Sequence, residues 1–368
     1  MDKRTIFLIG LNLLLWALLY FTRRKKKLSN TILFFASFLF FLSIIEFAYR
    51  AFSKKNCYTI TNIKEFNKYD SVLGHTMTMA GEFCVTKTSS DTIFKSTYTI
   101  ISDSAENYPN FNHRIGFSNP GSAKEIIFLG CSFTFGEGLE DTESLPYRTG
   151  KITQTNAINL GCMGYGLHQV YQLFDRKYAG IPNEQRIFVY SFLYDHILRA
   201  NGVYNWNEGS PFFSVIGDSL IHSGSLSANI LKPENKYIHY ISMLGTFSFL
   251  KNMLEKVALK SRVNKLRQID YDRCFLMINK MASHIKRTGG KLIIIDWDRK
   301  DWANSAINDL PGLMIEKQLN DLSDLNVNII RVSSVMDLND KACFIPNDGH
   351  PTAFANEKLA SAIAAIIE

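Results

Sequence analysis

The sequence predicts an α/β fold whose core is a parallel sheet, and two observations support this prediction. Short apolar runs have the composition of strands that are covered on both faces. They span residues 125–129, 157–160, 186–193, 291–296 and 327–332. The intervals between them include helical stretches at 167–179, 264–288, 312–324 and 352–367. Strands that alternate with helices are typical of a parallel sheet, because each connection must cross back before the next strand begins.

The region before this alternation is predicted to be a small β-rich segment, residues 56–122. Within it, residues 91–101 alternate polar and apolar side chains and are rich in Thr, Ile, Tyr and Phe, as a half-buried strand is. The main domain is expected to follow, over residues 123–368. One interval inside it, 200–245, is too long for a simple crossover. It is either a lid or binding loop, or an insertion without a function.

Two apolar segments near the N-terminus predict a transmembrane helical hairpin within residues 1–55. Residues 5–21 carry no charge and residues 28–47 carry only Glu46, and a bilayer core of roughly 30 Å needs about 20 apolar residues. The basic loop TRRKKK between them favours a cytoplasmic loop. The rest of the chain is then expected on the periplasmic or extracellular side of the cell inner membrane. The alternative is a cleaved signal peptide followed by one anchor.

The net charge of +7 does not indicate nucleic-acid binding, because the basic excess is confined to the hairpin. Residues 1–55 hold ten Lys and Arg against two acidic residues, which leaves 31 basic and 32 acidic residues in the rest of the chain. A nucleic-acid-binding domain needs a basic face on its folded part. The partners that we expect are therefore a membrane and a small or polymeric substrate, and no nucleic acid.

The six cysteines form no C-x-x-C pair, so the sequence shows neither a zinc motif nor a redox motif. No nucleotide-binding motif is visible either, and we expect no cofactor and no metal. Cys57 and Cys84 lie in the β-rich segment, and in an oxidising compartment they are able to pair. The sequence leaves open whether they do.

Ser132 is the candidate nucleophile. It follows the predicted strand 125–129 in the stretch GCSFTFG, and ligands of parallel α/β sheets bind at the carboxyl ends of the strands. Gly130 and Gly136 on either side allow a tight turn. A serine hydroxyl is a weak nucleophile unless a base accepts its proton, so the assignment requires a histidine.

His350 is the candidate base. It lies in the turn-rich stretch NDGHP, and Asp348 is close enough to orient the ring and to support its positive charge. His196 is a second histidine of interest, because it follows the end of the predicted strand 186–193. The remaining histidines are expected to be ordinary surface or core residues: His75, His113, His168, His222, His239 and His284.

These residues resemble the SGNH (GDSL-like) hydrolase superfamily. The stretches GCSFTFGEGL, NLGCMGYG and NDGHP are similar to its blocks I, II and V and occur in the same order. The resemblance covers residues 125–368 and implies a flavodoxin-like three-layer sandwich and ester chemistry on acyl groups. It also implies that Ser132 is the nucleophile, Gly164 the glycine of block II, His350 the base and Asp348 its carboxylate.

The chain departs from the family pattern at two positions. Cys131 replaces the aspartate that precedes the nucleophile, and a reading of Cys131 as a catalytic thiol is disfavoured. Block III, which supplies an asparagine donor in the family, is replaced by SFLYDH. An ionised Asp195 cannot donate a hydrogen bond, whereas His196 can. The expected oxyanion hole therefore consists of the Ser132 and Gly164 N–H groups with His196.

The function that these features favour is a membrane-anchored serine esterase acting on acyl esters of an envelope glycan or lipid. The spacing D-x-H resembles that of periplasmic polysaccharide O-acetyltransferases, so acyl transfer by the same residues is the alternative. A third reading is a catalytically silent glycan-binding or scaffold protein, because block III is altered.

Overall fold

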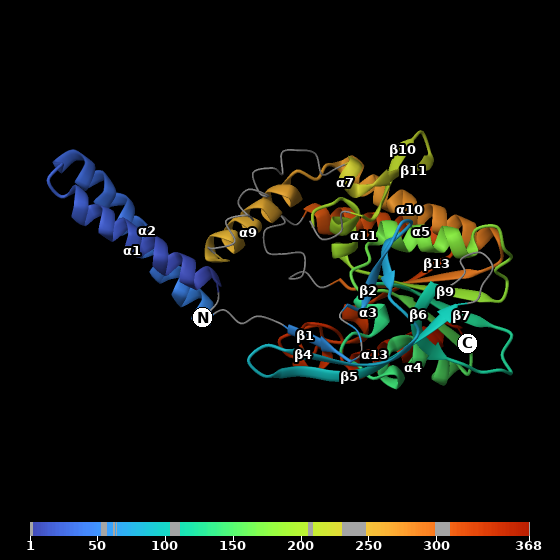
Figure 1. The fold of residues 1–368 in the computed structure, drawn as a ribbon. Helices are drawn as coiled ribbons and strands as arrows, with labels where there is room; N and C mark the ends of the chain where they lie inside the picture. Colours follow the sequence, from blue (N-terminus) through green and yellow to red (C-terminus); the bar gives the residue numbers. More distant parts are fainter. Residues whose placement is uncertain are drawn as a thin grey trace. The chain divides into compact units, whose positions relative to one another are not determined.

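The computed structural model describes residues 3–52, 57–61, 63, 65–103, 111–204, 209–229, 248–298 and 310–367. The chain divides into two compact units (Figure 1). The helical unit combines Met1–Lys55 with Lys232–Arg262, and the sheet unit combines Asn56–Leu231 with Val263–Glu368.

The sheet unit is built on one nine-stranded mixed sheet. In spatial order its strands are β1 (Cys57–Ile60), β4 (Gly81–Thr88), β5 (Thr92–Asp103), β6 (Phe111–Phe117), β8 (Asn156–Gly161), β7 (Glu125–Gly130), β9 (Arg186–Phe192), β12 (Lys291–Asp296) and β13 (Val327–Arg331). The run from β8 to β13 is parallel, so the prediction of an α/β fold with a parallel sheet is confirmed. The strands β1, β4, β5 and β6 come from the β-rich segment and extend the same sheet in antiparallel pairings.

Helices cover both faces of this sheet (Figure 1). One face carries α4 (Leu145–Thr153) and α13 (Ala353–Ile367), and the other carries α5 (Leu167–Tyr178), α6 (Tyr194–Ala200) and α10 (Gln268–Arg287). Among the described residues, the unit also contains the helices α3 (Ser132–Phe135), α7 (Leu226–Asn229), α11 (Leu310–Asn320) and α12 (Val332–Val335), with 3-10 turns at Asp141–Glu143, Asp321–Leu325 and Lys341–Cys343. Because both faces are covered, the central strands are apolar almost throughout.

Two small hairpins complete the sheet unit. The first pairs β2 (Asn67–Asp70) with β3 (Gly74–Met77), and its turn is closed by the Asp70 carboxylate, which accepts from the N–H groups of Val72 and Leu73 at 2.8 Å. The second pairs β10 (Pro211–Ile216) with β11 (Ser219–Ser225). It lies within the predicted insertion 200–245, whose residues 205–208 and 230–245 lie outside the described ranges.

The β1–β4 register separates Cys57 from Cys84. Cys57 lies opposite Thr88, four residues along β4 from Cys84, and strands rise about 3.3 Å per residue. A disulfide needs Cα atoms within about 7 Å, so these two cysteines do not pair, and both are free.

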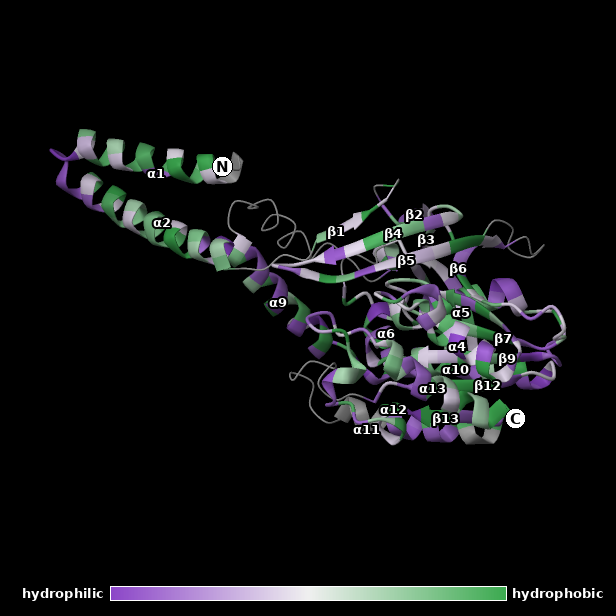
Figure 2. Cartoon of the chain, turned by 90° about the horizontal axis from the view of Figure 1, so that it is seen from below, coloured by the Kyte–Doolittle hydropathy of each residue, from purple (hydrophilic) through white to green (hydrophobic). Residues whose placement is uncertain are grey.

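The helical unit contains α1 (Lys3–Thr22), α2 (Lys26–Phe52) and most of α9 (Ser248–Asn264). The helices α1 and α2 are long and apolar enough to cross a membrane. Figure 2 shows hydrophobic residues along most of both helices and hydrophilic ones at the turn between them. Asn12 Nδ2 donates to Ser43 Oγ at 2.9 Å and links the two helices.

The helix α9 begins at a carboxylate of α2. Glu46 Oε1 and Oε2 accept from the N–H groups of Ser248 and Phe249, each at 2.8 Å, and Arg50 Nε lies 2.6 Å from Glu46 Oε1. The first N–H groups of a helix have no acceptor within the helix, so Glu46 supplies one. The helix α9 was not predicted from the sequence.

Candidate active site

Ser132 lies at the carboxyl end of β7, where the chain turns from the strand into α3. Gly130 ends β7 with φ +151°, and a Cβ there would lie 2.3 Å from Thr134 Oγ1. This close approach requires glycine, as expected for a sharp strand-to-helix turn. Ser132 is the first residue of α3, so its own N–H has no acceptor within that helix.

The structure brings Ser132, His350 and Asp348 together. His350 Nε2 lies 2.8 Å from Ser132 Oγ, and His350 Nδ1 lies 2.5 Å from Asp348 Oδ2. Ser132 and Asp348 therefore lie against opposite ring nitrogens of His350. With Asp348 accepting from Nδ1–H, the Nε2 atom is free to accept the serine proton.

Lys87 binds the far oxygen of Asp348. Its ammonium forms an ion pair with Asp348 Oδ1, and both side chains are buried. Although burial alone would raise the pKa of Asp348, the hydrogen bonds and charges of His350 and Lys87 lower it to about 2. Asp348 therefore stays ionised at any physiological pH and holds the imidazole in one tautomer.

Glu137 adds a second carboxylate next to the base. Its Oε2 atom lies 3.4 Å from His350 Nε2, and its Oε1 atom accepts from the Tyr58 hydroxyl at 2.7 Å. Burial acts to lower the pKa of His350, but the negative charges of Glu137 and Asp348 outweigh it, and the net pKa is raised. His350 is therefore a stronger base than a free histidine.

Arg114 of β6 holds the turn that follows Ser132. Its guanidinium is fully buried and donates to the carbonyls of Phe135, Gly136 and Leu139 at 3.0, 2.6 and 2.7 Å. Its Nε lies 2.7 Å from Asp141. An ammonium could not satisfy these acceptors in one plane, whereas a guanidinium can.

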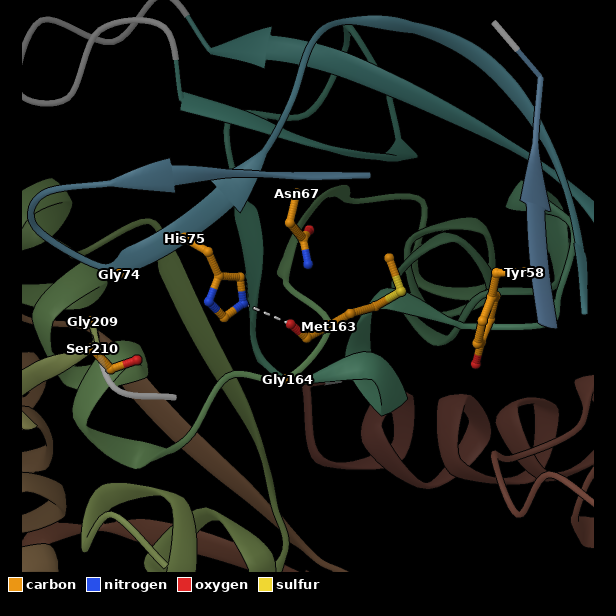
Figure 3. Close-up of a pocket in the computed structure, with 8 residues that line it drawn as sticks. All are labelled: Tyr58, Asn67, Gly74, His75, Met163, Gly164, Gly209 and Ser210. Carbon is orange, nitrogen blue, oxygen red and sulfur yellow. Dashed lines mark hydrogen bonds between the residues drawn. The ribbon is translucent and has the colours of Figure 1, made fainter. Parts of the chain in front are cut away.

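Gly164 follows β8 and lines a pocket of about 720 Å³. The other residues around the pocket are Tyr58, Asn67, Gly74, His75, Met163, Gly209 and Ser210. Figure 3 shows that they come from β1, the β2–β3 hairpin, the loop after β8 and the stretch before β10, with Tyr58 of β1 apart from the rest. Tyr58 connects this pocket to the group of Ser132, His350 and Asp348. Its hydroxyl donates to Glu137, and Glu137 lies beside His350.

The structure does not bring His196 into this cluster. Its ring is fully buried and stacks on the ring of Tyr190. The His196 Nδ1 atom forms a hydrogen bond of 2.8 Å with the Tyr190 hydroxyl. Burial lowers its pKa well below the usual value. Asp195 forms an ion pair with Arg199 and accepts a hydrogen bond from the Tyr204 hydroxyl. Cys131 is fully buried, which agrees with a packing role.

Glu137, Asp348 and His350 place ligand atoms within 4.8 Å of one another, close enough to hold a metal ion. The Lys87 ammonium already binds Asp348 there and would repel a cation. We therefore assign the group to acid–base chemistry.

Three residues around the site were not predicted from the sequence: Lys87, Glu137 and Tyr58. A signal for Lys87 is present: Phe83, Val85 and Lys87 alternate as the buried side of β4, so a lysine stands at a core position. Glu137 lies within GCSFTFGEGL itself, five residues after Ser132. Tyr58 has no such local signal, because its role depends on strand pairing at the sheet edge.

Neither a known protein family nor a curated protein matches the sequence. Among solved structures, the chain is similar to a lipolytic protein of the G-D-S-L family from Veillonella parvula, with 14% identity and a TM-score of 0.38 over 67% of this chain and 97% of that chain. It is also similar to an acylhydrolase described as putative from Bacteroides fragilis, with 14% identity and a TM-score of 0.37 over 69% and 89%.

A third similar structure is an acetyl xylan esterase from Butyrivibrio proteoclasticus, with 9% identity and a TM-score of 0.34 over 85% of this chain and 83% of that chain. Identities and scores at this level carry no argument about substrate. The functional proposal rests on the side chains of the site.

Proposed function

We propose that this protein is a membrane-anchored serine esterase that acts on acyl esters. One observation carries the proposal: the hydrogen-bonded series Ser132 Oγ, His350 and Asp348, at 2.8 and 2.5 Å. This arrangement activates a serine for attack on a carbonyl carbon. The apolar helices α1 and α2 support the anchor.

In the proposed reaction, Ser132 Oγ attacks the ester carbonyl while His350 Nε2 takes its proton. The N–H groups of Ser132 and Gly164 stabilise the oxyanion. Glu137, 3.4 Å from Nε2, stabilises the imidazolium that forms. The tetrahedral intermediate expels the alcohol, which takes the proton from His350. Water then attacks the acyl-serine while His350 takes its proton. The second tetrahedral intermediate expels Ser132 Oγ, which takes the proton back from His350, and the acyl group leaves as the carboxylic acid. His196 has no part in this scheme.

The acyl carrier that we propose is an envelope glycan or lipid on the periplasmic side. A sugar hydroxyl in place of water would make the same site an O-acyltransferase, and the pocket of about 720 Å³ beside Gly164 offers room for such an acceptor.

The test is p-nitrophenyl acetate hydrolysis by the full chain in detergent, with and without an envelope oligosaccharide. Ser132→Ala and His350→Ala are expected to lose activity to similar degrees, because the two residues act as a unit. The exposed Ser219→Ala and His222→Ala serve as controls. Acetyl groups on the oligosaccharide would indicate transfer. Activity that survives Ser132→Ala would overturn the proposal.

A further inference from the structure

The peptide between Met163 and Gly164 is held by a histidine from a distant part of the chain. His75 lies on β3, and its Nε2 atom is 2.9 Å from the Met163 carbonyl oxygen (Figure 3). From the sequence alone, His75 was expected to be an ordinary surface or core histidine. Its position against the glycine that we propose for the oxyanion hole gives it a different role.

The surrounding hydrogen bonds determine which nitrogen of His75 carries the proton. Gln169 Oε1 accepts from the Gly166 N–H at 3.0 Å, so Nε2 of Gln169 is its NH₂ group, and that group donates to the Leu73 carbonyl at 2.8 Å. The same NH₂ group faces His75 Nδ1 at 3.5 Å. Since two donors would repel each other, Nδ1 is the acceptor and Nε2 carries the hydrogen. His75 therefore donates to Met163.

This donation fixes the direction of the Gly164 N–H. A trans peptide is planar, so its C=O and N–H point in opposite directions. With the Met163 carbonyl directed at His75, the Gly164 N–H points away from His75. Gly164 has φ +82°, and no hydrogen-bond acceptor for its N–H occurs within the described ranges. A hydrogen bond to the carbonyl also polarises the peptide and strengthens its N–H as a donor.

The β2–β3 hairpin is anchored on both sides of the Met163–Gly164 peptide. The Tyr165 hydroxyl donates to the His75 carbonyl at 2.9 Å, and the two rings meet edge to face at 5.2 Å. Burial lowers the pKa of His75, which keeps the ring neutral. We propose that His75 is a positioning residue that orients and polarises the Gly164 N–H for the oxyanion. The proposal rests on the esterase function above.

The kinetic test compares His75→Phe with His75→Gln in the full chain, with His222→Phe as the control. Loss of one oxyanion donor costs about 10²–10³ in rate, and a misdirected donor is expected to cost at least ~10-fold in kcat with little change in KM. His75→Gln should recover much of the rate, because its amide N–H can reach the same carbonyl. An unchanged kcat in His75→Phe, or an effect on KM alone, would overturn the proposal.

A second measurement does not depend on turnover. Long-range ¹H–¹⁵N correlation spectra of histidine-labelled protein report the tautomer of each ring, and His75→Gln identifies the signals of His75. The Nε2–H tautomer supports the proposal, and the Nδ1–H tautomer overturns it. Ser132→Ala is assayed alongside. If that variant stays active, the esterase function fails; if it is inactive and His75→Phe is not impaired, only the role of His75 fails.

Discussion

At the scale of single residues, the proposed base His350 is placed between two carboxylates and near one ammonium. Asp348 binds one ring nitrogen, Glu137 lies beside the other, and Lys87 neutralises the far oxygen of Asp348. The charges raise the pKa of His350 in spite of its burial. Substitution of Asp348, Glu137 or Lys87 is therefore expected to change the charge around His350, each in its own way.

Glu137→Gln is expected to shift the pH profile of kcat/KM to lower pH. His350 must be neutral to accept the serine proton, so activity rises as pH passes the pKa of His350. The negative charge of Glu137 raises that pKa, and the neutral amide removes this contribution. Rates from about pH 5 to 9 check the shift, with the exposed Glu82→Gln as the control. A midpoint that stays in place or rises would contradict the role of Glu137.

Lys87→Met is expected to destabilise the fold. Asp348, with its pKa lowered to about 2, contributes stability that is present above the usual aspartate pKa of about 3.9 and lost as pH falls toward the folded value. Removal of one partner from a buried ion pair typically costs about 3–5 kcal/mol. Urea unfolding at neutral pH measures the loss. The double variant Lys87→Met/Asp348→Asn should be more stable than the single one, because no lone buried charge remains.

At the scale of elements, the antiparallel strands of the β-rich segment supply partners to the site that the parallel strands position. Lys87 comes from β4, Arg114 from β6 and His75 from β3. The parallel core provides Ser132 and Gly164 at its strand ends. The site is thus assembled from both halves of the nine-stranded sheet and from the β2–β3 hairpin.

Arg114→Met is expected to cost about 3–5 kcal/mol, because it leaves Asp141 and three carbonyls without their buried donor. Arg114→Lys should recover only part of this, since an ammonium cannot reach all the acceptors at once. Urea midpoints of the three proteins provide the measurement. Equal stability of Arg114→Met and the parent chain would show that water or another group satisfies these carbonyls.

The strands and the Ser132–His350–Asp348 cluster could be predicted from the sequence for a physical reason. Buried parallel strands leave continuous apolar runs, and Asp348 and His350 share one loop. The groups around them could not be predicted. Lys87 and Asp348 are separated by 261 residues in the sequence, and they meet through antiparallel strand pairing that no local pattern specifies. His196 was misplaced for the same reason: its position after β9 was predictable, but its rotation into the core beside Tyr190 was not.

At the scale of the whole molecule, the orientation of the sheet unit relative to a membrane is open to a direct test. The basic turn between α1 and α2 favours the cytoplasm. Alkaline phosphatase fused after residue 60 should then be active, and a fusion after residue 25 should be inactive. The reverse pattern would place the sheet unit in the cytoplasm.

The helical unit is assembled from two separate stretches of sequence, and this matters for preparing a water-soluble enzyme. Removal of residues 1–55 takes away Glu46 and Tyr49 but leaves α9 in the fragment. The helix α9 then lacks its carboxylate cap and the Tyr49 ring that contacts Phe249. We expect such a fragment to self-associate. Excision of residues 232–262 as well, with a flexible linker in their place, should yield a monomer. Light scattering of the two fragments distinguishes these outcomes.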